Sequence, residues 1–253
     1  MENRVTGTDR FRAILVLAAT VGVIVFNWLA ATGRLGSDTA AISDKYPTLV
    51  TPAGYAFSIW SLIYLGLIAF SIYQILPANL SRFRSVRSFY IASCAVNCAW
   101  LYFWHRDQIA LCFVVIVVLW ATIGAICYRL RDPESLRDTW LAKAPFGLYF
   151  GWVTAAMFVN LAIMLKFQGV ALSPTAETAL AVTLIVVAAA CAVLVSAKLT
   201  NYFYPLAVAW ALTAIAVQQS GHTAVVTTAA FGVIACLIAS LSFVMNLRSS
   251  ETR

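Results

Sequence analysis

Long apolar runs separated by short polar stretches dominate this chain. Each run is near the roughly 20 residues that a helix needs to cross a bilayer. The eight runs cover residues 12–32, 54–77, 87–105, 108–129, 144–166, 177–198, 202–218 and 222–247. They are too continuous for barrel strands, and helices satisfy their own backbone groups in lipid. We therefore predict an all-α, polytopic integral membrane helix bundle with about eight transmembrane helices. The short junctions at 105–108 and 218–222 decide whether the number is eight or smaller.

The composition supports this prediction and excludes a soluble protein. Of 253 residues, 62% are hydrophobic and only 11% are charged, against about 25% charged in soluble domains. The net charge of +7 does not indicate a nucleic-acid partner, because the basic residues lie in short loops between apolar runs. In a membrane protein this pattern reports orientation.

The loop charges predict that both termini lie in the cytoplasm. With eight spans, thirteen Lys and Arg residues fall on the side of the termini and four on the other side. This asymmetry favours the thirteen-charge side as cytoplasmic and requires an even number of helices. Free thiols and short loops are consistent with a bacterial inner membrane. The first run also resembles a signal peptide, but its length and Trp28 near the would-be cleavage site favour a retained helix.

Two longer connections organise the chain. The 166–177 linker contains Gly169 and Pro174, and Ser173 or Thr175 is a candidate cap for the next helix. It divides a five-helix core, residues 1–166, from three further helices and the tail, residues 167–253. The loop at 33–53 is long enough to fold over a helix bundle as a lid, or it is a plain surface connection.

A proline-bearing loop leads directly into an aromatic run at residues 54–77. Pro52 suits the turn before a helix because it lacks an N–H and fixes φ. Phe57, Trp60 and Tyr64 recur at spacings of three and four, so they share one helical face. Such a face favours the enclosure of a flat apolar molecule. The same spacing also fits rings that only pack against neighbouring helices.

Two later runs repeat the aromatic face and add an amide. The faces consist of Asn97, Trp100 and Trp104 in the third run, and of Tyr149, Trp152, Ala156 and Asn160 in the fifth. A buried amide needs a partner in lipid. That partner is an interhelical Asn or backbone group, or the polar edge of a ligand, and the two alternatives are compatible. The small residues Gly147, Gly151 and Ala155 predict close helix packing on the fifth run.

Ionisable side chains are missing from the predicted spans, apart from their ends. This argues against an ion-coupled transporter and an acid–base enzyme. His105 and His222 lie at run ends, and all six cysteines fall inside apolar runs without the spacing of a metal site. We predict no enzyme activity, no metal site and no resident cofactor.

The three aromatic motifs together resemble the tryptophan-rich sensory protein / translocator protein (TspO/MBR) family. The motifs are Pro52–Trp60–Tyr64, Asn97–Trp100–Trp104 and Trp152–Ala156–Asn160, and the resemblance covers about residues 10–166. It implies a five-helix bundle that binds porphyrins, sterols or other flat molecules under the first loop, often as a dimer. The chain departs from the family in lacking the loop tryptophan near Pro52, and its last three helices have no counterpart in five-helix members.

These observations predict a membrane protein that binds a flat hydrophobic ligand, such as a tetrapyrrole or a sterol, as a sensor or carrier. Its partners are the lipid bilayer, the ligand and, by resemblance, a second copy of the chain. The alternatives are a small transporter of an apolar or zwitterionic solute and a scaffold without a ligand. The predicted ligand-binding residues are Pro52, Tyr55, Phe57, Trp60, Tyr64, Asn97, Trp100, Trp104, Tyr149, Trp152 and Asn160.

Overall fold

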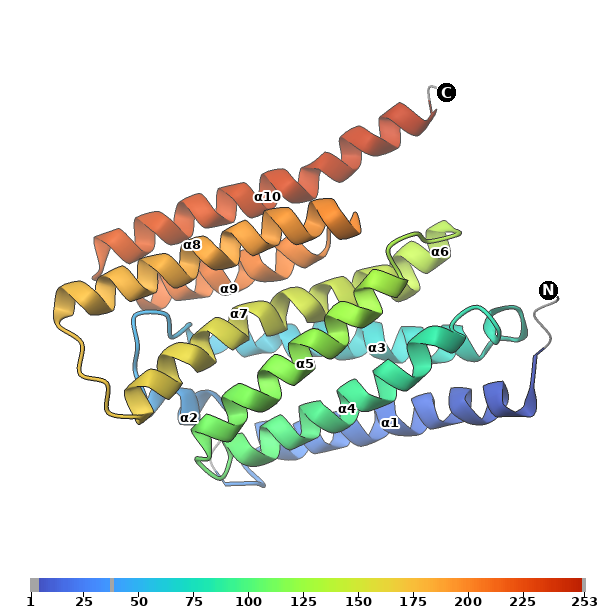
Figure 1. The fold of residues 1–253 in the computed structure, drawn as a ribbon, viewed down its shortest axis with the longest axis horizontal. Helices are drawn as coiled ribbons and strands as arrows, with labels where there is room; N and C mark the ends of the chain where they lie inside the picture. The colour runs from blue at the N-terminus through green and yellow to red at the C-terminus, as the bar shows by residue number, and fades with distance from the viewer. Residues whose placement is uncertain (1–4, 37–38, 252–253) are drawn as a thin grey trace. The chain divides into compact units, whose positions relative to one another are not determined.

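A computed structural model describes the backbone of residues 5–36 and 39–251, with side chains as far as residue 242 (Figure 1). The described residues form helices, turns and loops and no strand. The helices are α1 (Gly7–Ala31), α2 (Thr39–Asp44), α3 (Ile59–Ile75), α4 (Arg84–Trp104), α5 (Ile109–Arg129), α6 (Leu136–Asp138), α7 (Ala144–Phe167), α8 (Pro174–Leu199), α9 (Tyr204–Gln218) and α10 (Thr223–Glu251). Single turns add η1 (Gly54–Ser58) and η2 (Pro77–Asn79), both 3₁₀, and η3 (Thr139–Lys143), a π-helical turn.

The eight long helices coincide with the eight predicted runs, which confirms the all-α polytopic membrane bundle. Among the described residues, six helical segments are long and apolar enough to cross a membrane: Gly7–Ala31, Gly54–Ile75, Ile109–Arg129, Leu136–Phe167, Pro174–Leu199 and Thr223–Ser242. The other two are α9, which is shorter, and α4, which carries two Arg, one Asn and several Tyr and Trp residues.

The chain forms two compact units. The first contains residues 1–42 and 60–146, and the second contains residues 43–59 and 147–253. The segment before α3 and most of α7 therefore belong with the last three helices. The predicted division at residue 166 refers to a family core rather than to these units, and it stays a prediction.

In the first unit, α1 packs on α4 and α4 packs on α5 (Figure 1). A hydroxyl triad of Thr20, Ser71 and Tyr90 joins α1, α3 and α4. The Thr20 hydroxyl lies 2.5 Å from that of Ser71 and 2.6 Å from that of Tyr90. Since all three side chains are buried, the triad fixes the register of these helices at one level.

Buried charged side chains lie at one end of this unit. Helices α1 and α4 begin about one turn before the predicted runs. As a result, Asp9 and Arg87 are buried in their first turns, and Arg84 pairs with Asp9 through two bonds of 2.6 Å.

In the second unit, α8, α9 and α10 lie side by side (Figure 1). Gly147 and Gly151 of α7 have no room for a Cβ, which would overlap Asn201 and the backbone carbonyl of Tyr204. The predicted close packing of this row is confirmed, and it occurs within the chain. The predicted cap of α8 is also confirmed, because the Ser173 hydroxyl accepts from the amide of Ala176 at 3.3 Å.

Candidate functional site

The aromatic faces of α3 and α4 form as the spacing predicted. The rings of Trp60 and Tyr64 stack with centroids 5.3 Å apart and an interplanar angle of 16°. Trp100 and Trp104 stack in the same way at 5.3 Å and 21°. Trp100 and Trp104 are buried, whereas Trp60 and Tyr64 are half-buried. Helices α3 and α4 thus each present two nearly parallel rings, one turn apart.

An interhelical asparagine pair lies next to the α4 rings. Asn27 of α1 donates from Nδ2 to Oδ1 of Asn97 at 2.9 Å and to the carbonyl of Val23 at 2.8 Å. Asn97 is fully buried, and its Nδ2 has no hydrogen-bond partner among the described residues. Turning the Asn97 amide would place two N–H groups against each other, so its orientation is fixed. A buried donor without an acceptor is rare and costly, which marks this amide as available to an added acceptor.

The helix register relates this pair to the aromatic rings of α3. Asn27 and Asn97 each lie seven residues beyond the hydroxyl triad, on α1 and α4 respectively. Seven residues complete nearly two turns, so they keep the same facing direction. The same step along antiparallel α3 reaches Tyr64. By this register Tyr64 lies at the level of the asparagine pair, and Trp60 lies one turn further, near the level of Trp100.

The remaining predicted residues belong to the second unit. The ring of Phe57 meets that of Trp152 edge to face, with centroids 5.9 Å apart. Tyr149 and Trp152 are buried. The Asn160 amide donates to the carbonyl of Ala156, one turn back on its own helix, at 3.0 Å. A role of Asn160 in holding a ligand stays a prediction.

The segment before α3 is held by residues that the sequence analysis did not select. Trp210 of α9 donates from Nε1 to the carbonyl of Ala56 at 3.0 Å, and its ring packs edge to face on Tyr55. Gln219 donates from Nε2 to two carbonyls, those of Thr48 and Thr51, both at 3.1 Å. These bonds anchor residues 46–58, which include buried Pro52, to the middle of α9 and to its C-terminal end. Gln219 carried no sequence signal, because a single Gln at a helix end is usually solvated.

The predicted site residues are therefore divided between the two units. Trp60, Tyr64, Asn97, Trp100 and Trp104 belong to the first, and Pro52, Tyr55, Phe57, Tyr149, Trp152 and Asn160 belong to the second. Their convergence on one cavity stays a prediction. Among the described residues, no group of three or more His, Cys, Asp or Glu side chains is arranged to hold a metal ion.

Comparison with known families agrees with the resemblance that the three motifs showed. A family model described as TSPO-like protein matches residues 13–243. The chain belongs to the TSPO-like protein family. The match continues through the last three helices, so the expectation that the resemblance ends near residue 166 was too narrow, since it rested on aromatic motifs that stop there. Searches of curated proteins and of solved structures found no match.

Family membership and the apolar helices together establish an integral membrane protein that resides in a lipid bilayer. This TSPO-like chain carries uncharged aromatic and amide side chains along α3, α4 and α7, whereas the buried charges Asp9 and Arg87 lie in the first turns of α1 and α4. Such a set of groups can stack on a flat molecule and donate a hydrogen bond to it. It offers no nucleophile and base in hydrogen-bonding contact among the described residues of these faces.

Proposed function

We propose that this TSPO-like protein binds a flat hydrophobic ligand, such as a tetrapyrrole or a sterol, and acts as a membrane sensor or carrier. The observation that carries the proposal is the Asn97 amide, which is fully buried and keeps an unused donor beside two stacked tryptophans. Pockets for small molecules typically combine apolar walls with a few well-placed polar groups.

The proposed binding mode assigns separate roles to the rings and the amide. The rings of Trp60 and Trp100 offer flat apolar surfaces that exclude water. The Nδ2 of Asn97 donates to a carbonyl, carboxylate or hydroxyl oxygen at the edge of the ligand. We infer that the protein binds its ligand rather than converts it.

Titration with protoporphyrin IX tests the proposal. The purified protein should show saturable quenching of its tryptophan fluorescence. Asn97→Ala should weaken binding about fivefold, because the loss of one hydrogen bond costs about 1 kcal/mol. Trp60→Ala, as a separate variant, should weaken binding more than Asn97→Ala does, because it removes a whole ring surface. Trp140→Phe is the matched control, because Trp140 is 58% exposed and lies outside the candidate site. Unchanged binding constants in both Asn97→Ala and Trp60→Ala would contradict the proposed site.

A further inference from the structure

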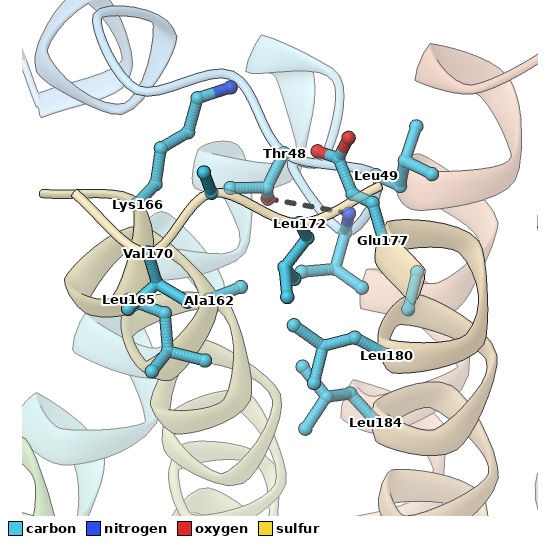
Figure 2. Close-up of a pocket in the computed structure, with 13 residues that line it drawn as sticks. Thr48, Leu49, Ala162, Leu165, Lys166, Val170, Leu172, Glu177, Leu180 and Leu184 are labelled. Atoms are coloured by element: carbon cyan, nitrogen blue, oxygen red, sulfur yellow. Dashed lines mark hydrogen bonds between the residues drawn. The ribbon is translucent and has the colours of Figure 1, made fainter. Parts of the chain in front are cut away.

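A cavity lies in the second unit, at the end of α7 and the start of α8 (Figure 2). Its volume is about 280 Å³, near the lower end of the range of about 300–1,000 Å³ for small-molecule sites. Figure 2 shows Leu165, Leu180 and Leu184 along its walls and Lys166 and Glu177 at one end. None of the predicted ligand-binding residues lines this cavity, so it is distinct from the proposed tetrapyrrole or sterol site.

The two charges at its end are separate from each other. The Lys166 ammonium donates to the carbonyl of Pro47, in the anchored segment. The Glu177 carboxylate forms no ion pair or hydrogen bond with a described residue. Because the two side chains do not form an ion pair with each other, the end of the cavity attracts a molecule that carries both a cation and an anion.

The position of these groups also indicates where such a molecule comes from. Lys166 lies in the last turn of α7, and Glu177 lies in the first turn of α8. Both helices qualify as membrane spans, so their ends lie near the level of the lipid head groups. The leucines extend from the head-group level along the helices toward the bilayer centre, the direction in which the acyl chain of a lipid runs.

We propose that this cavity binds a zwitterionic membrane lipid with a primary ammonium in its head group, namely a phosphatidylethanolamine. The ammonium pairs with Glu177, the phosphate approaches Lys166, and one acyl chain lies against the leucines. A lipid with an anionic head lacks the cation for Glu177, and a choline head lacks the N–H donors that strengthen such a pair.

Native mass spectrometry of the full-length chain in detergent tests this inference. The protein should retain dioctanoyl-phosphatidylethanolamine in preference to dioctanoyl-phosphatidylglycerol and dioctanoyl-phosphatidylcholine. Glu177→Gln should reduce that retention about tenfold or more, because it removes the negative charge that strengthens the hydrogen bond from the ammonium. Asp44→Asn is the control, because Asp44 is also an exposed acid of this unit but does not line the cavity.

A second pair of variants tests the cavity independently of charge. Ala171 lies in the exposed linker and lines the cavity, so Ala171→Trp should fill it and abolish retention without disturbing the buried core. Ala179→Trp places the same ring on an exposed position of α8 outside the cavity and should change nothing.

The outcomes separate the possible occupants. Equal retention of the three lipids, or retention unaffected by Glu177→Gln and Ala171→Trp, would overturn the inference. If free leucine binds with the same sensitivity to both variants and no lipid is retained, the site accepts a zwitterion but the lipid assignment is wrong. Protoporphyrin quenching should be unchanged in Glu177→Gln, so failure here leaves the proposed ligand site unaffected.

Discussion

Arg87 is completely buried, and its guanidinium is surrounded by acceptors from two helices. Its Nε donates to Oε1 of Gln74 at 2.7 Å, its Nη2 donates to the Gln74 carbonyl at 3.2 Å, and its Nη1 lies 3.8 Å from Asp9. Asp9 also holds Arg84 through two bonds. One carboxylate thus compensates two arginines at the junction of α1, α3 and α4.

Asp9→Asn should therefore destabilise the protein strongly. Removing one partner of a buried ion pair leaves an uncompensated charge and typically costs about 3–5 kcal/mol. We expect a loss near the lower end of that range, because Arg84 is 40% exposed. The free energy of unfolding in detergent, followed by tryptophan fluorescence, measures it. Asp132→Asn is the control: its pair with Arg131 is exposed and should contribute at most about 1 kcal/mol. Equal losses in the two variants would contradict the role given to Asp9.

Spacing predicted which side chains share a face but not what they contact. The stacked pairs on α3 and α4 follow from the three- and four-residue periodicity alone. The partner of Asn97 was open between another helix and a ligand, and the structure identifies Asn27 as the helix partner. Residues seventy positions apart carry no local signal of contact, so only the fold could supply this pair.

At the scale of helices, local capping signals locate the first turns better than the apolar runs do, since α1 begins at Gly7 after a capping box of Thr6 and Asp9. Helix α8 begins at Pro174 directly after its Ser173 cap, as the sequence predicted. Helices α1 and α4 begin earlier than predicted because their first turns contain charged residues. Those charges are tolerated there through the pairing of Asp9 with Arg84 and Arg87, which hydropathy alone does not reveal.

The approach of α7 to α9 gives a prediction about glycine. A Cβ on Gly151 would overlap the backbone carbonyl of Tyr204, which belongs to helix α9 and has little freedom to move. Gly151→Ala should lower the free energy of unfolding by about 1–3 kcal/mol, the usual cost of overpacking. Gly22→Ala is the matched control, because a Cβ at Gly22 meets nothing within 4 Å; there the better helix propensity of Ala should be neutral or stabilising. Similar stability changes at both positions, measured by thermal unfolding in detergent, would contradict the close approach.

The anchoring of residues 46–58 to α9 gives a second prediction at this scale. Gln219→Leu removes both hydrogen bonds to the carbonyls of Thr48 and Thr51. Backbone amides of this segment should then exchange faster with deuterium, by roughly fivefold or more, because two bonds that contribute about 0.5–1.5 kcal/mol each to the closed state are lost. Hydrogen-exchange mass spectrometry measures the rates. Gln218→Leu, at an exposed neighbouring position, should leave them unchanged, and equal rates in the two variants would show that Gln219 does not anchor the segment.

At the scale of the whole molecule, the number of long helices followed from the sequence, whereas the two compact units could not be predicted from it. The division of a five-helix family core from the last three helices at the 166–177 linker stays a prediction. Most of α7 groups in one compact unit with the helices that follow it, because its glycines admit α9 and the Thr154 hydroxyl accepts from that of Tyr204 at 2.8 Å. Small residues indicate that a helix is closely packed, but they do not specify which neighbour it accepts.

The described chain contains eight long helices, so the two termini lie on the same side of the membrane if each helix spans it. The loop charges predict that this side is the cytoplasm. Expressed in a bacterium, a C-terminal green fluorescent protein fusion should fluoresce, and a C-terminal alkaline phosphatase fusion should be inactive. Phosphatase fused after residue 170, in the linker between α7 and α8, should be active, because five spans precede it. This linker fusion is the control for export. An active phosphatase at the C-terminus would mean that one long helix, with short α9 the first candidate, does not cross the bilayer.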